Sequence, residues 1–276
     1  MESYVERPPL PALAGLVRTV WIQRTGDSAY LQRHLPTGGV EIHFPIGGPP
    51  QLVGPLTGPM IEVIPAHSTV VGVRFQPAAP PPLPTMLDDL VDQRLGLVEM
   101  WGSVTDRLVE AMAGADTAER ALRLLQAHLL QKFRRELSAD PLIREAVKVL
   151  MPWHRVTVDG LASRLAVSTS QLRRRCLHVV GVSPKVLQRA LRIQGCLALA
   201  QAGTSATGGS RGDGMAGLAI DAGYADQAHL SRECLRLTGL TPRQLFGGAS
   251  DRCACGHDHS ASYRPFLASR HQPQNR

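Results

Sequence analysis

The chain has 276 residues, 43% of them hydrophobic, which is enough for two domains with cores of their own. It has no run of about 18 apolar residues and no basic start followed by an apolar stretch, as a signal peptide would have, so we expect a cytoplasmic protein with no membrane partner. The net charge of +7 is uneven, since residues 1–140 carry −3, residues 141–248 carry +8 and residues 249–276 carry +2. This distribution indicates a polyanionic partner for the second half alone, against the alternative of ordinary surface charge.

The first 80 residues alternate short β-type runs with turn formers, which predicts a small barrel or sandwich. The predicted strands are Val17–Trp21, Val40–Ile46, Gln51–Val53, Met60–Ile64 and Thr69–Phe75. Glu41 and His43 share one face of their strand. Together with His34 they offer two imidazoles and a carboxylate, a donor set that suits a divalent metal, although the spacing is not the usual cupin one. Ordinary surface or hydrogen-bonded polar residues are the alternative.

The pattern becomes helical after the proline-rich run at 77–84, most clearly over Ala118–Leu137. We assign residues 1–137 to a β-rich sensing or dimerising domain that ends in helices. Helix starts are marked in the next segment by Asp140 before Pro141, Thr157, Ser168 with Gln171 as a capping box, Ser183 before Pro184, and Asp226. These signals predict a second, all-α domain over 138–247, with two helix-turn-helix units joined by a long helix from Pro184 to about Gln201.

The sequence QLRRRCLHVVGVSP at 171–184 is repeated without a gap as HLSRECLRLTGLTP at 229–242, with six identical positions. Leucine and cysteine at i and i+4 predict the buried side of a short helix in each copy, and Cys196 is likewise expected to be a small buried residue. The outward residues are Ser170, Gln171, Arg173 and Arg174 in the first copy, and Gln227, Ala228, His229, Ser231 and Arg232 in the second. Arginine can pair with guanine and glutamine with adenine, so the two helices would suit successive major-groove segments roughly 34 Å apart. A solvated face of a helical interaction module is the alternative.

Four blocks carry a resemblance to a known family: LASRLAVSTSQLRRRC, GVSPKVLQRALRI, LAIDAGYADQAHLSREC and GLTPRQLF. Through them residues 141–247 look like the DNA-binding domain of AraC/XylS-family bacterial transcription regulators. The resemblance implies double-stranded DNA as the partner, with base or backbone contacts from the outward residues. RNA polymerase, a small-molecule effector and a second copy of the chain are further candidate partners.

Two departures from the family pattern affect this interpretation. Ala166 stands where a glycine is usual, which is tolerable if its φ stays negative. The loop at 203–214 is longer than the usual link and would weaken binding if it loosened the second unit. In the N-terminal half, YVERPPLPALAGLVRTVW, LPTGGVEIHF and LVGPLTGP resemble the corresponding half of many actinobacterial members. That resemblance implies effector binding or dimerisation without identifying an effector.

Residues 248–276 have little apolar content and no periodicity, which predicts a disordered tail. The tail contains a cluster of metal-binding side chains, Cys253, Cys255, His257 and His259, that could close on Zn²⁺, Ni²⁺ or Cu⁺. Adventitious affinity is the alternative for this cluster. No glycine-rich phosphate loop, GxSxG or HExxH is present, so we expect neither an enzyme nor a cofactor. A metal- or thiol-responsive regulator, and a protein–protein adaptor that has lost DNA binding, are the competing functions.

Overall fold

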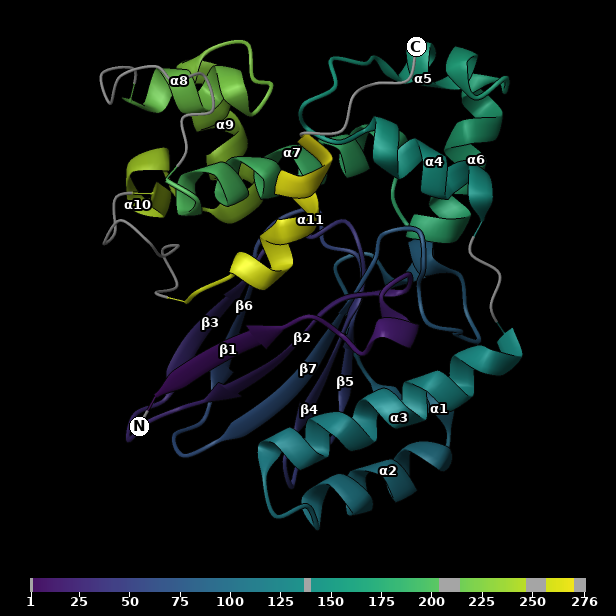
Figure 1. Cartoon of the computed structure of the whole chain (residues 1–276), viewed down its shortest axis with the longest axis vertical. Coiled ribbons are helices and arrows are strands. Elements are labelled where there is room, and N and C mark those ends of the chain that lie inside the picture. Colours follow the sequence, from purple (N-terminus) through teal and green to yellow (C-terminus); the bar gives the residue numbers. More distant parts are fainter. Residues whose placement is uncertain (1, 137–139, 204–213, 247–256, 271–276) are drawn as a thin grey trace.

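The computed structural model describes residues 2–136, 140–203, 214–246 and 257–270. Its N-terminal part is built on a six-stranded antiparallel sheet and a separate two-stranded sheet, and its C-terminal part is helical (Figure 1). The larger sheet has the order β1-β2-β7-β4-β5-β8, and the smaller one pairs β3 with β6. The strands are β1 Ser3–Arg7, β2 Val17–Arg24, β3 Tyr30–His34, β4 Glu41–Pro45, β5 Gln51–Val53, β6 Met60–Ile64, β7 Thr69–Phe75 and β8 Arg94–Gly96. The α+β class that the sequence predicted is confirmed.

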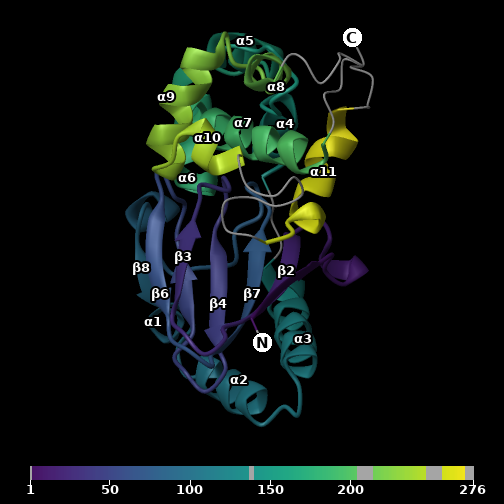
Figure 2. The same cartoon turned by 90° about the vertical axis from the view of Figure 1, so that its left-hand side faces the viewer.

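Helices α1 (Leu97–Trp101), α2 (Val104–Ala113) and α3 (Ala118–Glu136) cover one face of the six-stranded sheet (Figures 1 and 2). Alternate strand residues such as Ile42, Phe44 and Val73 point to these helices and meet Leu125 and Leu129 of α3 in one apolar core. The five strands predicted from alternation are all present. Three further strands, β1, β3 and β8, were missed, because their residues do not separate into an apolar and a polar face.

The opposite face of the large sheet turns toward the small β3–β6 sheet, and its side chains are mostly polar. Gln23 on β2 donates a hydrogen bond to Gln32 on β3, which joins the two sheets directly. His43 and Glu41 are buried on this side, whereas their neighbour Ile42 is buried in the apolar core. The central strands β2, β7 and β4 of the large sheet are therefore covered on both faces, and the space between the two sheets holds charged groups.

The helical part consists of α4 (Pro141–Val149), α5 (Val158–Arg164), α6 (Thr169–Val180), α7 (Pro184–Gln201), α8 (Gly214–Asp221), α9 (Gln227–Thr238) and α10 (Pro242–Phe246). The predicted helix caps are confirmed at Asp140, Thr157, Ser168, Ser183 and Asp226, whose side chains each accept backbone N–H groups. Helix α7 is buried along most of its length because α6, α8, α9 and α11 pack around it (Figure 1). Among the described residues, no helix combines the length and apolar character that a membrane crossing requires.

The expectation of a disordered tail is wrong for part of it, since Ser260–Arg270 form a helix, α11. Figures 1 and 2 show this helix lying between the helical part and the β-sheet, and it packs against α7, β1 and β2. Tyr263 and Phe266 are buried in the core of the helical part. Composition did not reveal the helix because serine, alanine and arginine make up most of it and Pro265 lies inside it.

Candidate nucleic-acid interface and adjoining cavity

Helix α6 presents a polar face at its N-terminal end. The side chain of Ser168 accepts from the backbone N–H of Gln171, and the side-chain amide oxygen (Oε1) of Gln171 accepts from the backbone N–H of Ser168, so the predicted capping box is present. Leu172 and Cys176 are fully buried beneath the helix, and the four predicted contact residues are exposed, namely Ser170, Gln171, Arg173 and Arg174. Capping occupies the side-chain oxygen Oε1 of Gln171 and leaves the side-chain N–H₂ group for another partner.

Helix α9 repeats this arrangement with one difference. Gln227, Ala228 and Arg232 are exposed, but His229 and Ser231 are only half-exposed. The His229 ring accepts a hydrogen bond from the Ala225 N–H and lies edge-on to Tyr224, and the Ser231 hydroxyl donates to the Gln227 carbonyl. His229 and Ser231 thus contribute to the first turn of α9, and its freest polar side chains are Gln227 and Arg232.

The sequence repeat has a structural explanation. Leu172 and Leu230 occupy equivalent buried positions in the shared core. Gly181 and Gly239 end the two helices in the left-handed region, at φ of 82° and 69°. An L-residue with a Cβ is disfavoured in that conformation, so the repeat keeps glycine at both ends. Arg174 and its counterpart Arg232 lie on the outer side of each unit.

Two other arginines have internal partners that the sequence did not reveal. Arg189 on α7 forms a bidentate ion pair with Glu233 on α9, with both distances 2.6 Å. Arg175 on α6 pairs with Asp140 at 2.7 Å, which ties the start of α4 to α6. Burial opposes ionisation of Glu233, but the Arg189 guanidinium outweighs it and lowers the pKa of that carboxyl. These ion pairs hold neighbouring helices together, and they leave the two arginines less available to DNA phosphates.

Ala166 adopts a left-handed backbone conformation. Its φ is +53°, in the left-handed region, so the condition of a negative φ is not met. The turn between α5 and α6 still closes, since the Ala166 N–H donates to Ser163 and the Val167 N–H donates to Ala162. An alanine here carries a backbone strain that glycine would not.

A cavity of about 590 Å³ lies at the junction of the β-rich and helical parts. Its volume is within the range of about 300–1,000 Å³ that small-molecule sites occupy. The walls combine aromatic, aliphatic and amide side chains from both parts: Trp21, Tyr30, Leu31, Gln32, Arg33, His34, Gln194, Leu240, Gln244 and Tyr263 are among them. The Arg33 guanidinium donates to the carbonyl oxygen of Thr238 at the end of α9, with a distance of 3.0 Å. One wall of the cavity is thereby tied to the C-terminal end of α9.

Arg18 on β2 is buried where β2, α7 and α11 meet. It donates to the Gln194 side chain of α7 and to the Ser262 carbonyl of α11, both at 2.9 Å, and it lies 4.6 Å from the centre of the Phe266 ring. Burial, with a smaller contribution from Arg74, lowers the pKa of Arg18 to about 10. Arg18 therefore remains charged near neutral pH and holds both helices onto the sheet.

Arg74 on β7 supports the same junction. Its guanidinium contacts Glu6 on β1, Glu41 on β4 and the hydroxyl of Ser262, at 2.7 to 2.8 Å. Glu6 also accepts from the Ser262 N–H and pairs with His259 at 2.8 Å. Burial raises the pKa of both carboxyls, but Arg74 and the histidines beside them outweigh it, so both pKa values fall well below the ordinary range. The two carboxylates are ionised and paired.

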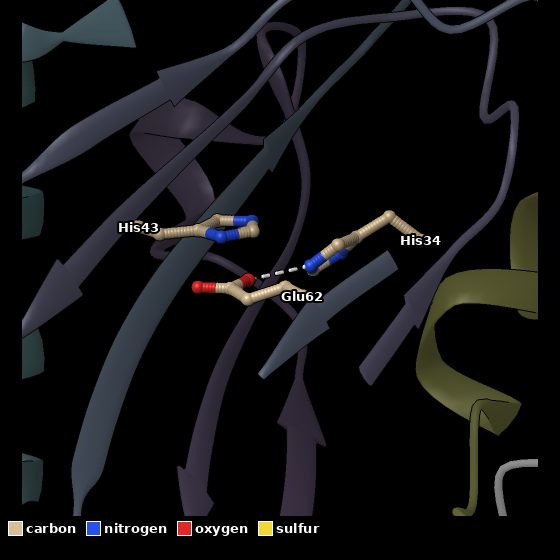
Figure 3. Close-up of side chains that lie close together, drawn as sticks. All are labelled: His34, His43 and Glu62. Carbon is tan, nitrogen blue, oxygen red and sulfur yellow. Dashed lines mark hydrogen bonds and ion pairs between the residues drawn. The ribbon is translucent and has the colours of Figure 1, made fainter. Parts of the chain in front are cut away.

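His34, His43 and Glu62 come together between the two sheets (Figure 3). Each offers one donor atom, and these atoms lie within 4.8 Å of one another. Burial lowers the pKa of His43 to about 4, although Glu41 opposes the shift, so its imidazole is neutral near pH 7. Burial would raise the pKa of Glu62, but His34 and Arg94 lower it to about 2. The sequence predicted Glu41 as the carboxylate ligand instead of Glu62, because the pairing of β3 with β6 could not be predicted from it.

The tail cluster is only partly described, because Cys253 and Cys255 lie outside the described residues. The ring of His257 stacks on Tyr4 with centroids 4.4 Å apart, and His259 pairs with Glu6. The two histidines are thus directed at β1. Metal binding by the four tail residues stays a prediction.

Comparison with known proteins separates the two parts of the chain. Residues 161–247 match the model of a helix-turn-helix domain, and residues 5–96 match a domain of unknown function, DUF6597. A search of curated protein sequences finds no significant match.

Among solved structures, the chain is similar to ToxT from Vibrio cholerae. An apo lysine-to-alanine variant from strain SCE256 gives a TM-score of 0.44 at 12% identity and covers 89% of this chain and 97% of that one. A 1.65 Å structure of ToxT gives 0.45 at 10% identity, covering 89% and 98%. ToxT bound to an unsaturated fatty acid gives 0.41 at 11% identity, covering 91% and 97%. Likeness at these TM-scores carries no functional argument. The helix-turn-helix match, together with the capped and repeated helices α6 and α9, identifies the C-terminal part of the chain as a helix-turn-helix domain of the AraC type, a DNA-binding domain of transcription regulators.

Proposed function

We propose that the protein is a sequence-specific transcription regulator that places α6 and α9 in successive major-groove segments of DNA, and that a small effector in the junction cavity modulates this binding. The observation that carries the proposal is the duplicated pattern at the two helices. In each copy a buried leucine and cysteine lie beneath a helix whose N-terminal end exposes an arginine and a glutamine. These are the side chains best suited to guanine and adenine edges.

The internal ion pairs support a rigid arrangement of the two helices proposed to contact DNA bases. The Arg189–Glu233 pair fixes α9 on α7, and the Arg175–Asp140 pair fixes α6 on α4. Recognition of two half-sites requires that the two helices keep a fixed spacing, because successive major-groove segments are about one helical turn apart. Such a regulator would act with RNA polymerase, and a second copy of the chain would bring a second pair of reading helices. Both partners stay predictions.

The cavity supports a coupling between effector and DNA. Its walls come from both parts of the chain, and Arg33 reaches from the wall to the end of α9. A ligand that fills the cavity would change the contacts between β3 and α9. By linkage, an effector that alters DNA affinity must itself bind with altered affinity when DNA is present.

The DNA-binding part is tested by selecting bound sequences from a random duplex pool with the intact protein near physiological salt. Enrichment of a site with two motifs about one helical turn apart is expected. On that site Arg174→Ala and Arg232→Ala should each weaken binding by about 1–3 kcal/mol, roughly 5- to 150-fold, and relax the preference at one position. Arg236→Ala is the matched control, because Arg236 is exposed one turn further along α9.

The outcomes separate the alternatives. An equal loss on all sequences, with the salt slope reduced by about one, would make the arginine a phosphate contact. No enrichment by the intact protein, with or without added small molecules, would favour the adaptor function.

The effector part is tested by a thermal-shift screen of small molecules on the intact protein. Compounds that raise Tm and change DNA affinity should lose both effects in Leu240→Trp, because the indole would fill the cavity that Leu240 lines. Leu235→Trp is the matched control, since Leu235 is exposed on α9. Unchanged binding of such compounds to the Leu240→Trp variant would place the effector elsewhere.

A further inference from the structure

The space between the two β-sheets holds a group of donor atoms that the regulator function does not use. His34 ends β3, Glu62 lies on the neighbouring strand β6, and His43 approaches from β4 of the larger sheet. In the β3–β6 ladder His34 pairs with Met60, so Glu62 is its diagonal neighbour on the same face. The three side chains converge from three strands, as Figure 3 shows, and their donor atoms all lie within 4.8 Å of one another.

Two imidazoles and one carboxylate form a donor set for divalent transition metals. Zn²⁺ binds histidine nitrogen at about 2.0–2.1 Å and carboxylate oxygen at about 2.0–2.2 Å, which places donors of a tetrahedral site about 3.4 Å apart. The Nε2 of His34 and Oε2 of Glu62 are 2.7 Å apart. An ion would therefore separate this pair slightly and draw the widest-spaced donors together by at most about 1.4 Å, a change that side-chain rotation can supply.

The imidazole of His43 is buried without a well-formed hydrogen bond at Nε2. It is 1% exposed, yet its Nε2 has no hydrogen-bond partner among the described residues. Buried polar atoms are nearly always paired, and an exception requires an explanation such as an ion or water. The nearest carboxylate oxygen, on Glu41, is 3.5 Å away, and Arg74 already holds both oxygens of that carboxylate.

Arg94 is the one positively charged side chain, in the described part of the chain, that pairs with any of the three ligands, and it does so through Oε1 of Glu62. This contact leaves Oε2 directed at His34. A partner that holds one oxygen of a ligating carboxylate orients the other toward the ion. Arg94 balances the charge of Glu62, so a bound divalent ion would keep its charge of about +2 and favour an anionic or strongly polar ligand.

We infer that His34, His43 and Glu62 form a binding site for a divalent transition-metal ion of the Zn²⁺ class. Because His34 also lines the junction cavity, the open coordination position of the ion would face that cavity. The ion would hold β3 and β6 onto β4, and it would offer the cavity a Lewis-acidic point for an effector's oxygen or nitrogen donor. The site stands independently of DNA binding, since none of its residues belongs to α6 or α9.

The test uses the intact chain carrying Cys253→Ser and Cys255→Ser, which removes the thiols of the tail as competing ligands. After chelator treatment and dialysis, the protein is titrated with Zn²⁺ by calorimetry and with Co²⁺ by visible absorption, and Mg²⁺ serves as the unmatched ion. We expect one ion per chain, a rise in Tm with Zn²⁺, and Co²⁺ bands of a four- or five-coordinate site.

His34→Gln and Glu62→Gln each remove one ligand while preserving side-chain size, and each should weaken Zn²⁺ binding at least 10-fold. His67→Gln is the matched control, because His67 is exposed on the loop before β7 and should leave the affinity unchanged. Near-UV circular dichroism of the metal-free variants checks that they fold. Failure of the tail-substituted protein to bind Zn²⁺ stoichiometrically, or equal affinity in all three variants, would overturn the inference.

Discussion

Replacing Phe266 with alanine tests whether α11 is part of the folded core. The ring is 2% exposed, and truncation of a buried phenylalanine costs about 3–5 kcal/mol. The Arg18 guanidinium, 4.6 Å from the ring centre, also loses a cation–π contact of about 1–2 kcal/mol. An isolated helix of 11 residues is marginal in water, so α11 depends on its docking against α7 and the sheet. If the substitution removes more than the free energy that docks α11, the helix detaches while the rest of the protein stays folded. The fall in the free energy of unfolding is therefore limited to the docking free energy of α11.

Two measurements separate a local loss from a global one. Urea unfolding of Phe266→Ala reports the change in the free energy of unfolding, and hydrogen exchange reports the protection of the α11 amides. We expect the urea midpoint to fall and the α11 amides to exchange fastest in the variant. Arg264→Ala is the control, since Arg264 is exposed in the same helix and its loss should stay within about 0.5 kcal/mol. A change in Phe266→Ala no larger than in this control, with unprotected α11 amides in the parent protein, would refute the packing of α11.

Three further outcomes follow from the helical part. Ala166→Gly should raise the free energy of unfolding by up to about 1 kcal/mol, because it relieves a φ of +53°, and urea unfolding that shows destabilisation would contradict the strain. Burial raises the pKa of the Cys176 and Cys234 thiols to about 12, so their reaction with an alkylating reagent at pH 8 should be roughly a thousandfold slower than that of a free thiol until denaturant is added; mass spectrometry reads this directly. Arg189→Met removes the partner of the Glu233 carboxylate and should lower the free energy of unfolding by about 1–3 kcal/mol, which calorimetry measures. It should also weaken DNA binding at one half-site only, which selection of bound sequences measures.

Local signals account for what could be predicted from the sequence. A helix cap needs only a few neighbouring residues, so Ser168 with Gln171 and Asp140 with Pro141 located helix starts correctly. The repeat located α6 and α9 because in both copies a leucine and a cysteine pack into the core and a glycine ends the helix. Helix α11 could not be predicted in this way, since its order comes from Arg18 and α7, which are distant in sequence.

The group of His34, His43 and Glu62 between the two sheets also could not be predicted fully from local sequence. Glu41 and His43 lie two residues apart on one strand face, so the sequence grouped them as ligands. The structure pairs Glu41 with Arg74 instead, and it brings Glu62 to His34 through the β3–β6 register. Alternation within a strand predicts which face a residue occupies, but the partner across two sheets depends on pairings that only the fold determines. A histidine on a buried polar strand face therefore predicts one metal-binding side chain. Which carboxylate is available beside it depends on the charged side chains that the fold brings close.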